Sequence, residues 1–183
     1  MKLEFAFTVA LIASMDVANA QCKLHTKTDD FDGSVTSWTD QVRIASDGMP
    51  GILKGPGYVE CSFKIFVNLV SAKGKVVLAI TERSKLCDCA TTALLLKFAD
   101  GKVLTKESPR SGQSKTISAW ETEQYSYFVL TKDELALLAS QKIVKFRLKA
   151  SGCSEHPVIE DEMSKRDAEK IQESANCILQ LKN

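Results

Sequence analysis

The stretch that decides the fold runs from Val59 to Ile80 and reads VECSFKIFVNLVSAKGKVVLAI. Its first twelve residues alternate, and the apolar set that shares one face is Val59, Cys61, Phe63, Ile65, Val67 and Leu69. A period of two is typical of a half-buried strand. Residues 71–75 then predict a turn, and 76–80 predict a returning antiparallel strand. Pairing Leu69 with Val76 would bring Cys61 close to Ser84.

Further strands and two helices are expected on either side of this hairpin. Asp100-Gly101 separates predicted strands at 93–98 and 103–104, and Asp-Gly between apolar runs favours a tight turn. Thr131-Lys132-Asp133-Glu134 is a capping box, in which the threonine and glutamate satisfy each other's backbone donors. It follows a predicted strand at 125–130 and begins a predicted short helix at 132–141. A strand over 143–150 comes next.

A C-terminal helix is predicted over about 161–181, because apolar residues recur there at the spacing of helical turns. Its core stripe holds Ala168, Ile171, Ala175 and Ile178. Near the other end, Asp32-Gly33 predicts a hairpin between 27–31 and 34–42, and 47–57 is an irregular loop rich in glycine and proline. We therefore expect a mainly β or α+β fold. It would be an antiparallel, sandwich-like sheet with the short and the C-terminal helix covering one face or edge.

The first twenty residues predict a signal peptide. An apolar run from Phe5 to Ser14 is followed by Ala18-Asn19-Ala20, the small-x-small pattern of a cleavage site. A run of about ten residues is too short to span a bilayer as a helix. A buried N-terminal helix and lipidation at Cys22 are the alternatives, and Gln21 is not the small residue that a lipidation site prefers. We expect one secreted or periplasmic β-rich domain over 21–183, without a transmembrane segment.

Six cysteines follow the signal segment: Cys22, Cys61, Cys87, Cys89, Cys153 and Cys177. An even number in an exported chain predicts a disulfide framework. The spacing of Cys87 and Cys89 would also allow a soft metal, but tetrahedral sites usually use two such pairs and the chain has no second one. Disulfides are therefore the preferred interpretation. We expect Cys153 to bond to Cys177, and Cys61 to bond to Cys87 or Cys89.

The composition and motifs exclude several functional classes. Lys plus Arg is 24 and Asp plus Glu is 23, so the chain lacks the basic excess of a nucleic-acid binder. Neither a zinc-protease motif nor a serine-hydrolase elbow occurs, and the glycines of 51–57 are not followed by Gly-Lys-Ser/Thr. The turn at Asp30–Gly33 lacks two key carboxylates of a calcium loop. The sequence therefore predicts no catalytic, cofactor-binding or metal residue.

Two groups of residues are candidates for a ligand surface. One predicted strand has a basic outward face, formed by Lys142, Lys145, Arg147 and Lys149, which could bind an anionic polymer or headgroup. The alternative is that they keep the strand soluble and prevent edge pairing. Trp120 and Tyr125, with Tyr127, could form an aromatic platform for a sugar. The alternative is that both tyrosines pack in the core on the same face as Val129.

Four segments carry a resemblance to known proteins: residues 27–33, 94–101, 127–135 and 142–148. Their order resembles a loose group of small exported proteins of uncharacterised function, found in the Bacteroidetes and related bacteria. The resemblance implies an exported compartment and the broad fold, and it implies no catalytic residue.

Together these observations predict an exported, non-enzymatic binding or structural domain. Its ligand would be extracellular or part of the cell envelope, with no cofactor and no nucleic acid. The alternative is a small secreted hydrolase whose site is built from scattered carboxylates or His156.

Overall fold

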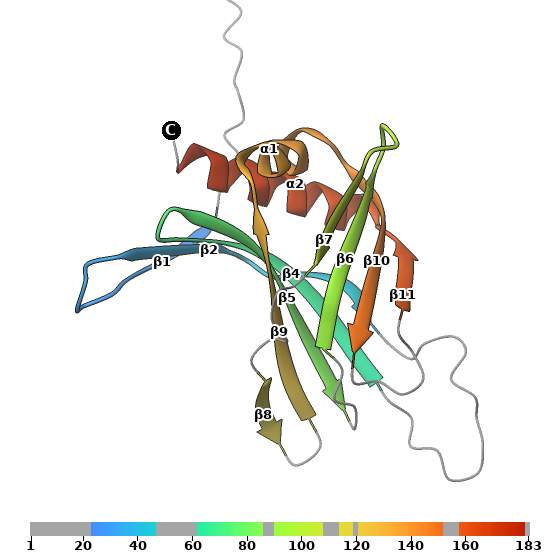
Figure 1. Cartoon of the computed structure of the whole chain (residues 1–183), viewed down its shortest axis with the longest axis horizontal. Helices are drawn as coiled ribbons and strands as arrows, with labels where there is room; N and C mark the ends of the chain where they lie inside the picture. The colour runs from blue at the N-terminus through green and yellow to red at the C-terminus, as the bar shows by residue number, and fades with distance from the viewer. Residues whose placement is uncertain are drawn as a thin grey trace, which may run out of the picture.

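The computed structural model describes residues 23–46, 62–85, 90–107, 114–118, 121–151 and 158–181 (Figure 1). The strands within these ranges are β1 (Leu24–Thr28), β2 (Val35–Thr39), β3 (Val42–Ser46), β4 (Ser62–Ala72), β5 (Lys75–Lys85), β6 (Ala90–Phe98), β7 (Val103–Glu107), β8 (Ser114–Ser118), β9 (Glu121–Leu130), β10 (Ile143–Ser151) and β11 (Val158–Glu162). The helices are α1 (Lys132–Ser140) and α2 (Lys165–Gln180). The predicted signal peptide, the loop at 47–57, Trp120, His156 and every cysteine except Cys177 lie outside the described residues.

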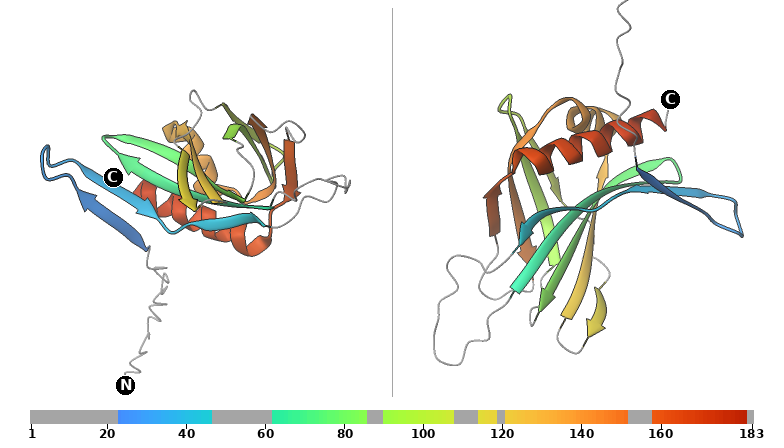
Figure 2. Two further views of the ribbon diagram at one scale, coloured as in Figure 1. Left: turned by 90° about the horizontal axis from the view of Figure 1, so that it is seen from below. Right: turned by 180° about the vertical axis from the view of Figure 1, so that it is seen from behind.

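The strands form two antiparallel sheets. The seven-stranded sheet has the order β1-β2-β4-β5-β9-β8, with β3 also paired to β4, and the four-stranded sheet has the order β11-β10-β6-β7. The two sheets face each other, and α1 and α2 pack together at one end of them (Figures 1 and 2). This confirms the predicted mainly β, antiparallel fold with a short helix and a C-terminal helix. Neither described helix has the length and apolar character needed to cross a membrane.

The central hairpin confirms both predicted strands but corrects their register. Its turn consists of Lys73 and Gly74 alone, whose φ angles of 47° and 76° suit a tight two-residue turn. Leu69 therefore lies opposite Leu78, and the predicted pairing with Val76 is wrong. Because the shift is two residues, the same side chains still point inward.

Two element boundaries also differ from the prediction. The C-terminal helix begins at Lys165 and not near 161, because residues 158–162 form β11 on the edge of β10. Ser164 is the N-cap, and its hydroxyl accepts a hydrogen bond from the backbone N–H of Asp167 at 3.2 Å. Near the N-terminus, Val42 begins β3 and is not part of the second hairpin strand.

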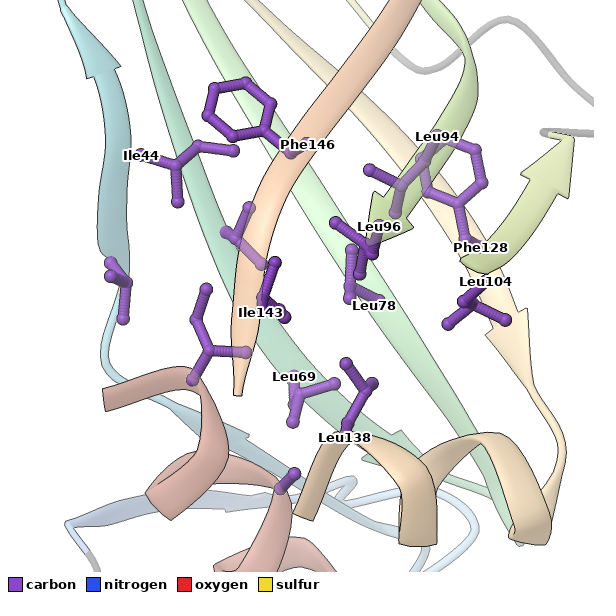
Figure 3. Close-up of a cluster of buried hydrophobic side chains, with 14 of the residues drawn as sticks. Ile44, Leu69, Leu78, Leu94, Leu96, Leu104, Phe128, Leu138, Ile143 and Phe146 are labelled. Atoms are coloured by element: carbon purple, nitrogen blue, oxygen red, sulfur yellow. The ribbon is translucent and has the colours of Figure 1, made fainter. Parts of the chain in front are cut away.

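The core lies between the two sheets and continues under the helices. Figure 3 shows Leu69, Leu78 and Phe128 of the seven-stranded sheet in one buried cluster with Leu94, Leu96 and Phe146 of the four-stranded sheet and Leu138 of α1. On β9 the inward residues are Ser126, Phe128 and Leu130. Tyr127 and Val129 are 43% and 48% exposed. The expectation that the tyrosines of this strand pack in the core on the face of Val129 is therefore wrong.

The predicted capping box is present and makes a testable contribution to stability. The Thr131 hydroxyl accepts from the Glu134 N–H at 3.2 Å, and Glu134 Oε2 accepts from the Thr131 N–H at 2.8 Å. We expect Thr131→Ala to lower the free energy of unfolding by about 1 kcal/mol, because it leaves a helix donor without its partner. Urea unfolding measures this loss. Thr26→Ala, on exposed β1, is the control, and an equal loss in both variants would contradict a capping role.

Candidate functional site

Two adjoining cavities lie along the outer face of the four-stranded sheet. The first has a volume of about 490 Å³ and lies beside the start of β10 and the junction between β11 and α2. The second has a volume of about 150 Å³ and lies over β6, β7 and β10. Both are lined by Lys97 and Lys145. We call the combined surface the lysine groove, and its charged members are Lys97, Lys142, Lys145, Arg147, Lys165, Glu160 and Glu162.

The strand register explains why these side chains meet. Lys145 lies opposite Lys97 on β6 and opposite Glu162 on β11, while Arg147 lies opposite Glu160. Residues directly opposite each other in a sheet point to the same face. The basic stripe predicted on β10 therefore stands in the middle of a sheet, with neighbours on both sides. The interpretation that it prevents edge pairing is wrong, because β11 occupies that edge.

The first cavity has an apolar floor. The register between β6 and β10 shifts between Ile143 and Lys145, and the carbonyl of the extra residue, Val144, accepts a hydrogen bond from the Met163 N–H at 2.9 Å. This contact holds the start of α2 close to β10. Ile143, Met163 and Ala168 are buried beneath the lysines. The cavity thus combines an apolar base with a cationic rim.

Positive charge dominates the lysine groove. It holds five cationic and two anionic side chains, a local balance of 5 − 2 = +3 in a chain whose formal net charge is +1. The remainder of the chain therefore carries +1 − 3 = −2. Basic groups are concentrated in this groove although the protein as a whole is nearly neutral.

The cations of the groove differ in their partners. Glu160 pairs with both Lys145 and Arg147, and hydrogen bonds from these two side chains hold the pKa of Glu160 below its ordinary value. Lys142 Nζ pairs with Glu169 at 2.8 Å. Among the described residues, neither Lys97 nor Lys165 has a carboxylate within ion-pair distance. These two lysines are the cations available to an incoming anion.

The structure separates the two surfaces that the sequence predicted. Lys145 and Arg147 lie in the lysine groove, and Lys149 follows on the same face, opposite Ala93 and Val158. Tyr125 lies on the other sheet, on β9. The structure does not bring it near the basic stripe.

Tyr125 is part of a network on the outer face of the seven-stranded sheet. Its hydroxyl donates to Glu123, which also accepts from Arg83 Nε at 2.6 Å, and Arg83 lies 5.1 Å above the ring of Phe66. Burial, and then the Glu123 carboxylate, raise the pKa of Tyr125 to about 12. The hydroxyl is therefore engaged within the protein, which does not favour a sugar platform at this residue.

The sequence prediction did not include two residues that the groove needs. Lys97 stands between the inward residues Leu96 and Phe98, and that alternation marks it as an outward residue of β6. Lys165 is the first residue of α2, and no local pattern connects it with β6. Only the fold brings the two lysines to one cavity.

Glu82 is a further polar residue that the prediction missed. It is 3% exposed, and its one hydrogen bond within the described part of the chain comes from the Thr91 hydroxyl to Oε2 at 3.4 Å. Burial raises the pKa of Glu82 to about 7. The alternation along this strand could have shown that Glu82 is buried, since Val76, Leu78 and Ile80 point inward and Glu82 takes the next inward position.

Cys177 is the one cysteine among the described residues. It lies on the buried side of α2, 6% exposed, and it is disulfide-bonded and not a free thiol. The Cys153–Cys177 bridge and the bonding of Cys61 to Cys87 or Cys89 remain predictions. Non-reducing peptide mapping reads these pairings directly.

In the part of the chain that the structure describes, no three His, Cys, Asp or Glu side chains gather as a metal site would require. Comparisons with protein families, with curated proteins and with solved structures give no match to this chain. Its function therefore has to be inferred from the chemistry of the lysine groove.

Proposed function

We propose that the protein is an exported, non-enzymatic binding domain that holds an anionic ligand in the lysine groove. The observation that carries this proposal is the gathering of five cationic side chains around two adjoining cavities, with Lys97 and Lys165 free of ion pairs among the described residues. Export is supported by the apolar run and the small-x-small site at residues 18–20, and by the resemblance to small exported bacterial proteins.

The groove would bind by charge attraction and by burial of apolar surface. Lysine ammonium groups act as point charges, so they accept carboxylate, phosphate or sulfate groups without strict geometry. The apolar floor of the first cavity favours a ligand that carries an apolar group beside its charges. Binding of exposed charges is screened by salt, so affinity should fall as ionic strength rises.

The test uses the mature protein and a labelled oligoglutamate probe, with binding read by fluorescence anisotropy. Inorganic phosphate and a sulfated polysaccharide compete with the probe in separate arms, which distinguishes the three anionic groups. We expect Lys97→Gln combined with Lys165→Gln to weaken binding by about fivefold, because two exposed charge contacts contribute roughly 1 kcal/mol together.

The matched control is Lys64→Gln, an exposed lysine on β4 outside the groove, and it should bind like the wild type. Equal weakening in the control and the groove variant would indicate general charge attraction and contradict a site. Failure of all three anions to bind the wild type would also overturn the proposal.

The alternative, a small secreted hydrolase, has one observation in its favour. Glu82 is the described carboxyl group whose pKa is raised to about 7, a value suited to a general acid. However, its side chain is almost fully enclosed and no second carboxylate is hydrogen-bonded to it. A role in stability accounts for Glu82 better than a role in catalysis.

A further inference from the structure

The β1–β2 hairpin forms an arm that projects from the body of the protein (Figure 1). Phe31 stands at its tip and is fully exposed, at 101% of the reference area. Asp29, Asp30 and Asp32 surround it in the sequence. Phe31 is the most exposed of the large hydrophobic side chains among the described residues, so its whole ring is available for burial against a partner.

The tip is held rigidly by its own aspartates. Asp29 Oδ1 accepts from the Phe31 N–H at 2.8 Å, and Asp32 Oδ1 accepts from the Ser34 N–H at 2.8 Å. Asp32 also pairs with Lys73 Nζ, at 2.9 Å, in the turn of the β4–β5 hairpin. The hydrogen bonds from Ser34, and then the one from Lys73, lower the pKa of Asp32 to about 2. A segment that is already ordered loses little conformational entropy when it binds.

The first cavity of the lysine groove has the complementary chemistry. Its apolar floor suits a phenyl ring, and its volume of about 490 Å³ leaves ample room for one. Its rim is cationic, whereas the neighbours of Phe31 are anionic. Among the described residues, Asp29 and Asp30 have no cationic partner, and Lys97 and Lys165 have no anionic one.

The arm and the cavity lie at opposite ends of the molecule. In Figure 1 the β1–β2 tip is at one end of the long horizontal axis, and β11 with the start of α2 is at the other end. Both views of Figure 2 show the same separation. The arm therefore cannot reach the cavity of its own chain, although it can reach the cavity of a neighbour.

We propose that Phe31 of one molecule inserts into the lysine groove of a second copy, so that copies of the chain associate head to tail. The proposal rests on the proposed function, because it identifies the anionic ligand of the groove as the aspartate-flanked tip of another copy. Such a contact joins two different surfaces, and it builds open chains or closed rings according to the rotation between copies. High salt should dissociate the assembly by screening the aspartate and lysine charges.

Analytical ultracentrifugation of the mature protein over a range of concentrations tests this. We expect the wild type to show mass that grows with concentration, and Phe31→Ala to weaken association by about tenfold to a hundredfold, because it removes the burial of one aromatic ring. Val129→Ala removes a half-exposed apolar side chain from β9, away from the arm, and should associate like the wild type. Because Phe31 has no contacts to lose, thermal unfolding should be the same in Phe31→Ala and wild type.

Mixing two defective variants is the decisive experiment. Phe31→Ala lacks the inserting ring but keeps the groove, and the double variant Lys97→Glu with Lys165→Glu lacks the groove but keeps the arm. Each alone should be largely monomeric at a concentration where the wild type associates. Their mixture should form one-to-one dimers and nothing longer, because only one productive contact is possible.

Wild-type protein that stays monomeric up to millimolar concentration would overturn the proposal, as would Phe31→Ala that associates like the wild type. The two proposals fail separately, because Phe31→Ala still contains the groove. Oligoglutamate binding by Phe31→Ala, combined with a monomeric wild type, would reject self-association and retain anion binding. If neither protein binds oligoglutamate, phosphate or sulfated polysaccharide and the wild type is monomeric, both proposals are wrong.

Discussion

Glu82→Gln is expected to remove most of the pH dependence of stability between pH 5 and pH 8. In the wild type, the free energy of unfolding should fall by about 3 kcal/mol as the pH rises through this range. In the variant it should stay nearly level. Urea unfolding at a series of pH values measures both profiles.

The sign follows from the pKa of Glu82 in the two states. In the folded protein burial raises it from 4.5 to about 7, while the unfolded chain keeps the ordinary value. Between these values the folded state binds one more proton than the unfolded state, so raising the pH favours unfolding. Stability from this group is complete below about pH 4.5 and is lost as the pH passes through 7. A difference of 7 − 4.5 = 2.5 pKa units corresponds to about 3 kcal/mol.

The surroundings of Glu82 explain why burial dominates. Ile65 of β4 and Gln124 of β9 lie opposite it, and Thr91 of β6 donates a hydrogen bond to it. None of these three side chains carries a charge. The nearest cation in the sequence, Arg83, points to the other face of the sheet and pairs with Glu123. No ion pair among the described residues compensates the buried carboxylate.

The control is Glu107→Gln, which changes an exposed carboxyl group at the end of β7 and should leave the wild-type pH profile intact. Comparison between the wild type and Glu82→Gln cancels the titration of all other groups. A Glu82→Gln profile that falls as steeply as the wild-type profile would show that another group causes the pH dependence. That result would remove Glu82 from the explanation.

Strong local patterns predicted the fold well. The alternation in β4 and the capping box at Thr131 each depend on residues that are close in sequence, and the structure confirms the strand and the helix that they indicate. The two-residue error in the β4–β5 register arose because a short turn and a longer one are compatible with the same alternation. Only the positive φ angles of Lys73 and Gly74 decide between them.

Features that depend on distant partners were not visible in the sequence. The sequence pattern places Asp161 and Glu162 at the start of the C-terminal helix, but they end β11, which pairs with β10 and whose Glu160 contacts Lys145 and Arg147. Lys165 and Lys97 belong to different sequence regions and meet only at the first cavity. The sequence therefore indicated one basic strand, whereas the candidate site draws on β6, β10, β11 and α2.

Strand β9 shows most clearly where pattern reasoning fails. Apolar residues stand on both of its faces, since Tyr125, Tyr127 and Val129 alternate with Ser126, Phe128 and Leu130. The first set is the more continuous, and it was predicted to face the core. Packing against the four-stranded sheet selects the second set instead, because those side chains meet the inward leucines of β6. Local hydrophobicity could not decide between the faces.

The choice of face on β9 leads to the second large expected effect. Phe128→Ala should lower the free energy of unfolding by about 3–5 kcal/mol, whereas Val129→Ala, at the next position, should lower it by less than about 1 kcal/mol. Phe128 is fully buried, lies opposite Leu78 on β5, and belongs to the cluster in Figure 3 that also holds Leu94 and Leu104. Its removal leaves a cavity that a close-packed core fills only in part.

Urea unfolding of both variants measures the contrast, and it separates the two assignments of the strand. If the odd-numbered face were the core, Val129→Ala would be the costly change and Phe128→Ala the mild one. If Phe128→Ala does not fold, Phe128→Leu is compared with Val129→Ala in its place. It retains an apolar side chain and should lower the free energy of unfolding by about 1 kcal/mol. Losses of equal size at Phe128 and Val129 would contradict the sandwich core, since a core between the two sheets requires that only one face of β9 be packed.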